Sequence, residues 1–180
     1  TNAIFDYFGY TPINNIMDMT AHIGCDAINF YRRFNASCIC IENDLETYKC
    51  LKENLTQFSK ESKTRLFPVH ANCMEFIRGF KKQMDFVYID CPWGGPRYWE
   101  YDLIMLHLEY NGYNIPLYEV VHRVLDEKFT NTIILKVPSN FDFSTFRSII
   151  GTRCSIDIER IMKSGYKPKL AYYMVFCKEY

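Results

Sequence analysis

The chain has 180 residues, which is room for one domain with a sizeable core and too little for two ordinary domains. Hydrophobic residues make up 48% and charged residues 23%, a globular composition that excludes a disordered chain. The formal net charge is zero, which excludes a generic polyanion binder. Any contact with nucleic acid must therefore come from a local patch.

The cysteines indicate a reducing compartment. No pair forms a C-x-x-C motif, and Cys38 and Cys40 lie inside an apolar run, so buried reduced thiols are expected instead of disulfides or a metal site. No apolar run approaches 18 residues, and no membrane contact is expected. The sequence thus predicts a soluble protein of the cytoplasm or nucleus. The eight cysteines are Cys25, Cys38, Cys40, Cys50, Cys73, Cys91, Cys154 and Cys177.

Strand-length apolar runs alternate with segments of helical period along the first half of the chain. Asp26 is expected to cap the first helix, and a Pro- and Gly-rich break follows the fourth strand. The predicted order is strand Asn15–Met19, helix Asp26–Phe34, strand Ser37–Glu42, helix Asp44–Phe58, strand Arg65–Val69, helix Cys73–Lys81 and strand Asp85–Asp90.

The second half ends differently. Helix Leu117–Leu125, strand Thr132–Val137 and helix Phe143–Ile150 continue the alternation, and strands Ser155–Met162 and Leu170–Cys177 then follow each other across a Gly-Tyr-Lys-Pro turn. Parallel neighbours need crossover connections, whereas consecutive strands form hairpins. The order predicts an α/β, Rossmann-like fold: a mostly parallel seven-stranded sheet, helices on both faces, and an antiparallel hairpin at one edge.

Polar residues follow the first three predicted strands. Asp18 ends the first strand, and a loop containing Gly24 leads to a helix. Glu42 ends the second strand, where a carboxylate either accepts both hydroxyls of a ribose or caps the next helix. Asn72 follows the third strand and either bonds an adenine edge or starts a helix. Ligands of such sheets bind at the carboxyl ends of the strands, so together the three ends suit an adenosyl group.

The fourth strand ends in the sharpest signal of the sequence, Asp90-Cys91-Pro92-Trp93-Gly94-Gly95-Pro96. Pro restricts the chain and the two glycines permit unusual torsions, so Trp93 would be presented beside the Asp90 carboxylate. A carboxylate next to an aromatic ring suits a planar amine held between an acceptor and a stacking face. The competing interpretation is a tight turn with a packing Trp.

At these residues the sequence resembles the class I methyltransferases that modify exocyclic amines. More narrowly, Pro92-Trp93-Gly94-Gly95-Pro96 with Tyr98 is similar to the motif of the trimethylguanosine synthase family, the RNA cap guanine-N2 methyltransferases. The resemblance also covers Thr11-Pro12 and the ranges 17–30, 41–44 and 137–140. The sequence is also similar in shape to small homologues encoded by large DNA viruses.

The resemblance implies one methyltransferase domain over residues 1–180, with residues 1–13 as a lead-in and 14–180 as the core. It implies S-adenosylmethionine as cofactor, S-adenosylhomocysteine as product, 7-methylguanosine-capped RNA as partner, and no metal. The implied catalytic residues are Asp90, Cys91, Pro92 and Trp93. The implied cofactor residues are Asp18, Ala21, Gly24, Asp26, Glu42, Asn43, Asn72, Cys73 and Asp90. The implied substrate residues are Trp93, Arg97, Tyr98, Lys136, Ser139 and Asn140.

Three positions depart from the family pattern. Cys91 replaces a proline, Asp90 replaces a smaller polar residue, and Ser139 stands where the family often has an arginine for phosphate. Phosphate contact would then fall to Lys136, Arg97 or another basic residue, or would be weaker. Asp90 is also compatible with adenine N6 or an internal guanine N2 as the target amine. Cys91 is also compatible with a catalytically inactive module of the same fold that binds the cap or RNA.

Overall fold

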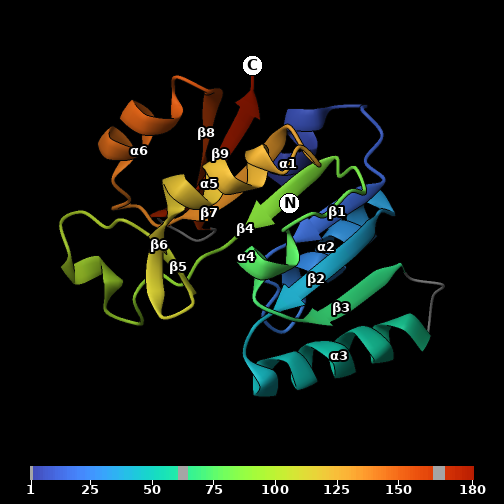
Figure 1. Cartoon of the computed structure of the whole chain (residues 1–180). Coiled ribbons are helices and arrows are strands. Elements are labelled where there is room, and N and C mark those ends of the chain that lie inside the picture. Colours follow the sequence, from blue (N-terminus) through green and yellow to red (C-terminus); the bar gives the residue numbers. More distant parts are fainter. Residues whose placement is uncertain (1, 61–64, 164–168) are drawn as a thin grey trace.

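A computed structural model describes residues 2–60, 65–163 and 169–180. Its main sheet has seven strands in the order β3-β2-β1-β4-β7-β9-β8, and Figure 1 shows the sheet with helices packed around it. The first five strands in this order run parallel, whereas β9 is antiparallel to both β7 and β8. The strands are β1 (Asn15–Asp18), β2 (Ser37–Glu42), β3 (Leu66–His70), β4 (Phe86–Ile89), β7 (Thr132–Val137), β8 (Cys154–Lys163) and β9 (Lys169–Glu179).

Helices cover both faces of this sheet because successive strand residues point to opposite sides. In β4, Phe86 and Tyr88 join one buried cluster, and Val87 and Ile89 join the other. The first cluster is covered by α1 (Asn2–Phe8), α2 (Cys25–Phe34) and α3 (Leu45–Lys60). The second is covered by α4 (Cys73–Phe76), α5 (Leu117–Asp126) and α6 (Phe143–Ile150).

The predicted fold class is confirmed, including the antiparallel hairpin at the sheet edge. Two local expectations were wrong. The helix expected to reach Lys81 ends at Phe76, and the turn that follows includes Gly79 at φ 71°. The N-cap of α2 is Gly24 and not Asp26, which lies in the first turn. The predicted Gly-Tyr-Lys-Pro turn falls on residues 165–168, outside the described residues.

Two further elements were not predicted. The expected lead-in contains α1, whose Tyr7 ring stacks on Phe176 at 4.2 Å and whose Phe8 ring stacks on Phe86 at 5.5 Å. A helix of seven residues has little stability of its own, so these contacts explain it better than its sequence does. The second element is a separate hairpin, β5 (His107–Tyr110) and β6 (Tyr113–Pro116), which follows the short 3-10 turn Tyr98–Glu100.

The remaining features of the described part of the chain concern the length of its helices, the clustering of its His, Cys, Asp and Glu side chains, and the state of its cysteines. None of its helices has the length and apolar character needed to cross a membrane. Residues 2–60, 65–163 and 169–180 also contain no group of three or more His, Cys, Asp or Glu side chains arranged to hold a metal ion. All eight cysteines are free thiols.

Candidate active site

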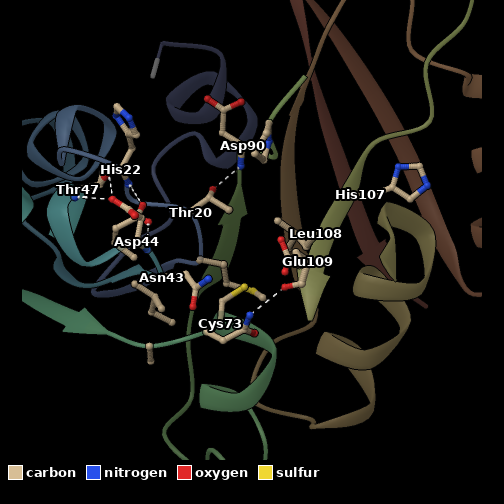
Figure 2. A pocket seen from close by; sticks show the side chains of 16 residues that line it. Thr20, His22, Asn43, Asp44, Thr47, Cys73, Asp90, His107, Leu108 and Glu109 are labelled. Atoms are coloured by element: carbon tan, nitrogen blue, oxygen red, sulfur yellow. Dashed lines mark hydrogen bonds between the residues drawn. The ribbon is translucent and has the colours of Figure 1, made fainter. Parts of the chain in front are cut away.

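A cavity of about 340 Å³ opens at the carboxyl ends of β1, β2, β3 and β4. Parallel strands end at the same edge of a sheet, and this brings Thr20, Glu42, Asn72 and Asp90 to one place. Figure 2 shows Asn43 and Asp44 on one side of the cavity and Leu108 and Glu109 of the β5–β6 hairpin on the other. Five predicted cofactor residues line it, namely Glu42, Asn43, Asn72, Cys73 and Asp90.

A second cavity of about 650 Å³ adjoins the first. Both are lined by Thr20, His22, Asp90 and Pro92, so the Asp90 loop lies at their junction. The remaining lining residues come from the β1–α2 loop, the first turn of α2, the loop of residues 90–96 (the motif loop) and β7; they include Ala21, Asp26, Cys91, Trp93 and Lys136. The first cavity combines apolar walls with polar residues from the strand ends, and the second contains Asp90 and Trp93.

Backbone hydrogen bonds hold the loops of the site in place. The Asp90 N–H donates to Thr20 Oγ1 at 2.7 Å, which ties the motif loop to the loop after β1. Glu42 accepts from the His22 N–H at 3.0 Å and from the Asp44 N–H at 2.8 Å. Asp44 itself accepts from the Thr47 N–H and caps α3. Each Glu42 oxygen keeps a second lone pair, so the carboxylate can still accept ribose hydroxyls.

The Asn72 side chain does start a helix, as one of its two interpretations expected. Its Oδ1 accepts from the Met74 N–H at 3.0 Å, and its Nδ2 donates to the Glu109 carbonyl at 2.9 Å. The second bond fastens the β5–β6 hairpin to the end of β3. Asn72 thus positions the hairpin wall of the first cavity, and the second lone pair of Oδ1 and the second hydrogen of Nδ2 remain for any contact with adenine.

Two predicted cofactor residues lie behind the cavity walls. A Cβ on Gly24 would come within 2.9 Å of Leu51 and 3.0 Å of Leu55, and its φ is 91°. Asp18 is 1% exposed and accepts from the Thr20 N–H. Burial raises the pKa of Asp18 well above its usual range, and the neighbouring Asp26 adds to the increase. Both residues shape the loop from the inside and do not line either cavity.

Charged groups meet where β4 and β7 end beside α2. Lys136 Nζ lies 2.7 Å from Asp90 Oδ2 and 3.8 Å from Asp26 Oδ2. The Tyr88 hydroxyl donates to Asp26 Oδ2 at 3.1 Å. Burial raises the pKa of Asp90, and the charge and hydrogen bond of Lys136 oppose this increase.

The motif loop presents Trp93 to the second cavity. Trp93 is half-buried and packs edge-on against Tyr98, with ring centroids 5.0 Å apart. Its indole N–H is buried and makes no hydrogen bond of normal geometry among the described residues, but it lies close enough to the Asp90 carboxylate to oppose the rise in that group's pKa. The Cys91 side chain is 2% exposed and packs in the core. Burial raises the pKa of this thiol well above its ordinary value, so the thiol is neutral.

Four of the predicted substrate residues, Arg97, Tyr98, Ser139 and Asn140, lie outside both cavities. Asn140 Nδ2 donates to the carbonyls of Tyr98 and Tyr101 at 2.9 and 2.7 Å, so it clamps the loop after the motif. Arg97 is exposed and lies 3.8 Å from Glu100. Ser139 is exposed on the surface beside Asn140.

Sequence reasoning missed Thr20 and the hairpin residues His107, Leu108 and Glu109 as parts of the site. A signal for the hairpin was present. Asn111-Gly112 lies between alternating residues, and both adopt positive φ, 53° and 76°, as a two-residue turn of this kind requires. Thr20 carried no such signal, because its bond to Asp90 spans 70 residues.

The comparisons with known proteins agree with this geometry. A family model described as RNA cap guanine-N2 methyltransferase matches residues 13–177. The chain is 28% identical over 137 residues to the uncharacterised protein L320 of Acanthamoeba polyphaga mimivirus, a match that covers 73% of this chain and 48% of that protein. The chain therefore spans about half the length of this curated relative. The similarity to a mimivirus protein supports the resemblance to homologues encoded by large DNA viruses.

Solved structures show the same fold at low identity. A precorrin-6y C5,15-methyltransferase from Geobacter metallireducens has a TM-score of 0.65 at 12% identity, covering 99% of this chain and 87% of that one. A METTL16 MTase domain has a TM-score of 0.67 at 10% identity, covering 99% and 65%. The family match extends over nearly the whole chain, which thus belongs to the RNA cap guanine-N2 methyltransferase family.

Proposed function

We propose that this methyltransferase modifies the exocyclic N2 amine of the 7-methylguanosine cap of RNA. The observation that carries the proposal is the pairing of Asp90 and Trp93 on the wall of one cavity. A carboxylate accepts hydrogens from a planar amine, and an indole face beside it stacks on the ring that bears the amine. The family description supports the same substrate.

The residues present fit S-adenosylmethionine. The first cavity has apolar walls at Ile41, Ala71 and Leu108 for a purine ring, and Glu42 at the end of β2 for the ribose. The second cavity reaches Ala21 and Asp26 beside α2, where the methionine end would lie. When bound, the cofactor supplies a methyl group that its sulfonium already activates.

Because the methyl group is already activated, the protein mainly has to align the amine. Asp90 and the Cys91 carbonyl would accept the two N2 hydrogens, which directs the nitrogen lone pair toward the methyl group. Alignment of this kind supplies several kcal/mol of the barrier. No strong base is needed beforehand, because the methylated amine loses its proton readily.

In this proposal, Trp93 makes the site prefer a methylated cap. The 7-methylguanine ring carries a positive charge, and an indole face attracts a desolvated cation by about 2 kcal/mol. Trp93 is half-buried at the cavity wall, where this attraction is not fully screened by water. An unmethylated cap lacks the charge, and the same stacking would hold it about 30-fold less tightly.

A second candidate is transfer to adenine N6 or to an internal guanine N2. Asp90 favours it, since a carboxylate at this position fits the broader group of amino-methyltransferases. A labelled-methyl assay separates the two. It compares 7-methylguanosine-capped RNA, RNA with an unmethylated cap, uncapped RNA of the same sequence, and adenine-containing DNA. Transfer to the methylated cap alone is the expected result, and transfer only to the DNA would refute the cap proposal.

A further inference from the structure

Lys136 occupies the centre of the charged cluster in the active site. It belongs to β7, next to β4 in the sheet, and its ammonium lies 2.7 Å from Asp90 and 3.8 Å from Asp26. The Tyr172 ring of β9 lies 5.3 Å from the same ammonium. Among the described residues that line the two cavities, Lys136 is the one Lys or Arg side chain. Its side chain is 23% exposed, which leaves it within reach of the cavity but largely withdrawn from bulk water.

We infer that Lys136 is a positioning residue that keeps Asp90 ionised and orients its carboxylate for the acceptor amine. Lys136 bonds Asp90 Oδ2, so Oδ1 is the oxygen with more lone-pair capacity left to accept an amine hydrogen. The Asp90 N–H is meanwhile held by Thr20. With one oxygen and the backbone both fixed, the carboxylate has little freedom to rotate. This role differs from the phosphate contact that the sequence predicted for Lys136.

The surroundings of Asp90 explain why a cation is needed there. Without Lys136, the groups around Asp90 are acidic or neutral, and both burial and negative neighbours favour the protonated carboxyl. A protonated carboxyl would lose an acceptor site and would present a hydrogen to the amine. The titratable groups that face Asp90 and Lys136 are Asp18 of β1, Asp26 of α2, Tyr88 of β4, Cys91 of the motif loop and Tyr172 of β9.

The direction of each pKa agrees with this arrangement. Burial raises the pKa of Asp90, and Lys136 is the main influence that lowers it. Burial lowers the pKa of Lys136, but the charge and hydrogen bond of Asp90 outweigh it, so the net effect is an increase. Lys136 therefore stays charged at every pH at which the enzyme would be assayed, and only the Asp90 end of the pair titrates.

The first test needs no substrate. Carbon-13 NMR of protein labelled at the aspartate carboxyl carbons follows the titration of Asp90, whose signal is identified by its loss in Asp90→Asn. In Lys136→Met the Asp90 titration should move upward by at least about one pH unit, as expected when an opposite charge within 4–6 Å is removed. Lys136→Arg keeps the charge and should titrate like the wild type. Lys178→Met is the matched control. Lys178 is an exposed lysine of β9 that pairs with Thr132, at the opposite end of β7 from Lys136.

An unchanged Asp90 titration in Lys136→Met would overturn the inference. Circular dichroism of each variant verifies the fold, and Lys136→Gln, which keeps a hydrogen-bond donor without the charge, provides the same comparison if the Met variant does not fold. The titration also separates the two proposals. If it moves as expected but the wild type methylates none of the acceptors, the proposed function fails while the Lys136–Asp90 coupling stands.

The second test measures the effect on turnover, and it depends on the proposed role of Asp90. With capped RNA, kcat of Lys136→Met should fall at least about fivefold at the pH where the wild type is half-active, with KM for S-adenosylmethionine changed less than twofold. Lys136→Arg should recover most of the loss. In an Asp90→Ala background, Lys136→Met should cause no further loss of kcat. Equal losses in both backgrounds would show that Lys136 acts independently of Asp90.

Discussion

At the scale of single residues, the backbone torsions of two glycines shape the motif loop. Gly94 and Gly95 both have φ 91°, a region that disfavours residues with a Cβ, although no atom would clash with a Cβ built on either. These torsions turn the chain sharply after Trp93. The half-buried Trp93 ring is thereby placed near the Asp90 carboxylate, on the wall of the same cavity.

Replacing Trp93 by Ala should raise KM for 7-methylguanosine-capped RNA by about 30-fold, because the cation–π contact of about 2 kcal/mol is lost. The Kd of S-adenosylmethionine, measured by calorimetry, should change little. Trp93→Phe keeps a smaller aromatic face and should give an intermediate KM. An Ala variant with wild-type KM would remove Trp93 from cap recognition.

Asp90→Asn should lower kcat by about a hundredfold, the usual effect of removing one group that acts on the transition state, and should leave cofactor affinity nearly unchanged. The wild-type rate should also fall at acid pH. The ionised carboxylate is the active form, so activity is present above the Asp90 pKa and is lost as pH falls through it. Burial raises that pKa, so the loss begins at a higher pH than for an ordinary Asp. A rate independent of pH down to the usual range of Asp would contradict this role.

At the scale of elements, loops at the strand ends are positioned by the helices and hairpins that pack behind them. Gly24 ends the β1–α2 loop, caps α2 and lies against Leu51 and Leu55 of α3. Asn72 lies in the short loop after β3, caps α4 and holds Glu109 of the hairpin. Each of these residues joins two elements. Asn72 also lines the first cavity, whereas Gly24 shapes the loop beside the cavities without lining either.

The packing around Gly24 predicts a difference between two glycines with positive φ. Gly24→Ala and Gly79→Ala both introduce a Cβ in the left-handed region, which costs about 1–2 kcal/mol. Only Gly24→Ala also forces Leu51 and Leu55 to move, since nothing lies within 4 Å of a Cβ at Gly79. Urea denaturation should show the larger loss of unfolding free energy for Gly24→Ala. Equal losses would mean that α3 adjusts freely.

The hairpin tether can be removed without removing the helix cap. Asn72→Asp keeps an oxygen that caps α4 but cannot donate to the Glu109 carbonyl. Loss of one neutral hydrogen bond of about 1 kcal/mol should weaken S-adenosylmethionine binding about fivefold, because the wall formed by Leu108 loosens. Calorimetry measures this, with Asn114→Asp on the outer strand of the hairpin as the control. Unchanged binding in Asn72→Asp would separate the hairpin from cofactor affinity.

At the scale of the whole molecule, two apolar clusters on opposite faces hold the sheet. α1 closes the face that also carries α2 and α3, where Ile4 is fully buried and Tyr7 and Phe8 stack on β9 and β4. This first helix joins the two halves of the sheet, because β4 lies on one side of β7 and β9 on the other. The expected lead-in is therefore part of the packed domain.

Ile4→Ala should lower the free energy of unfolding by about 2–5 kcal/mol, the usual cost of emptying a fully buried aliphatic site. Tyr10→Ala, at a fully exposed position just beyond α1, should stay within about 0.5 kcal/mol of the wild type. Chemical denaturation of the whole chain measures both. A small effect at Ile4 would show that α1 is dispensable for the domain.

The sequence alone predicted the main-sheet strands and most helices in their order along the chain, and it placed the candidate site at the ends of the strands. Ser37–Glu42, Thr132–Val137 and Phe143–Ile150 were predicted with their observed bounds. Periodicity, turn residues and the motif are local properties, and they are visible in any stretch of chain. The Asn111-Gly112 turn was equally local and was overlooked.

Only the tertiary structure decided which distant groups meet. Lys136 and Asp90 lie 46 residues apart, Thr20 and Asp90 lie 70 apart, and Asn72 reaches Glu109 across 37. α1 forms because the sheet offers it Phe86 and Phe176. Such contacts depend on strand order and helix packing, which no local pattern encodes. The sequence thus determined which residues lie at the strand ends, and the fold decided that Lys136 is paired with Asp90.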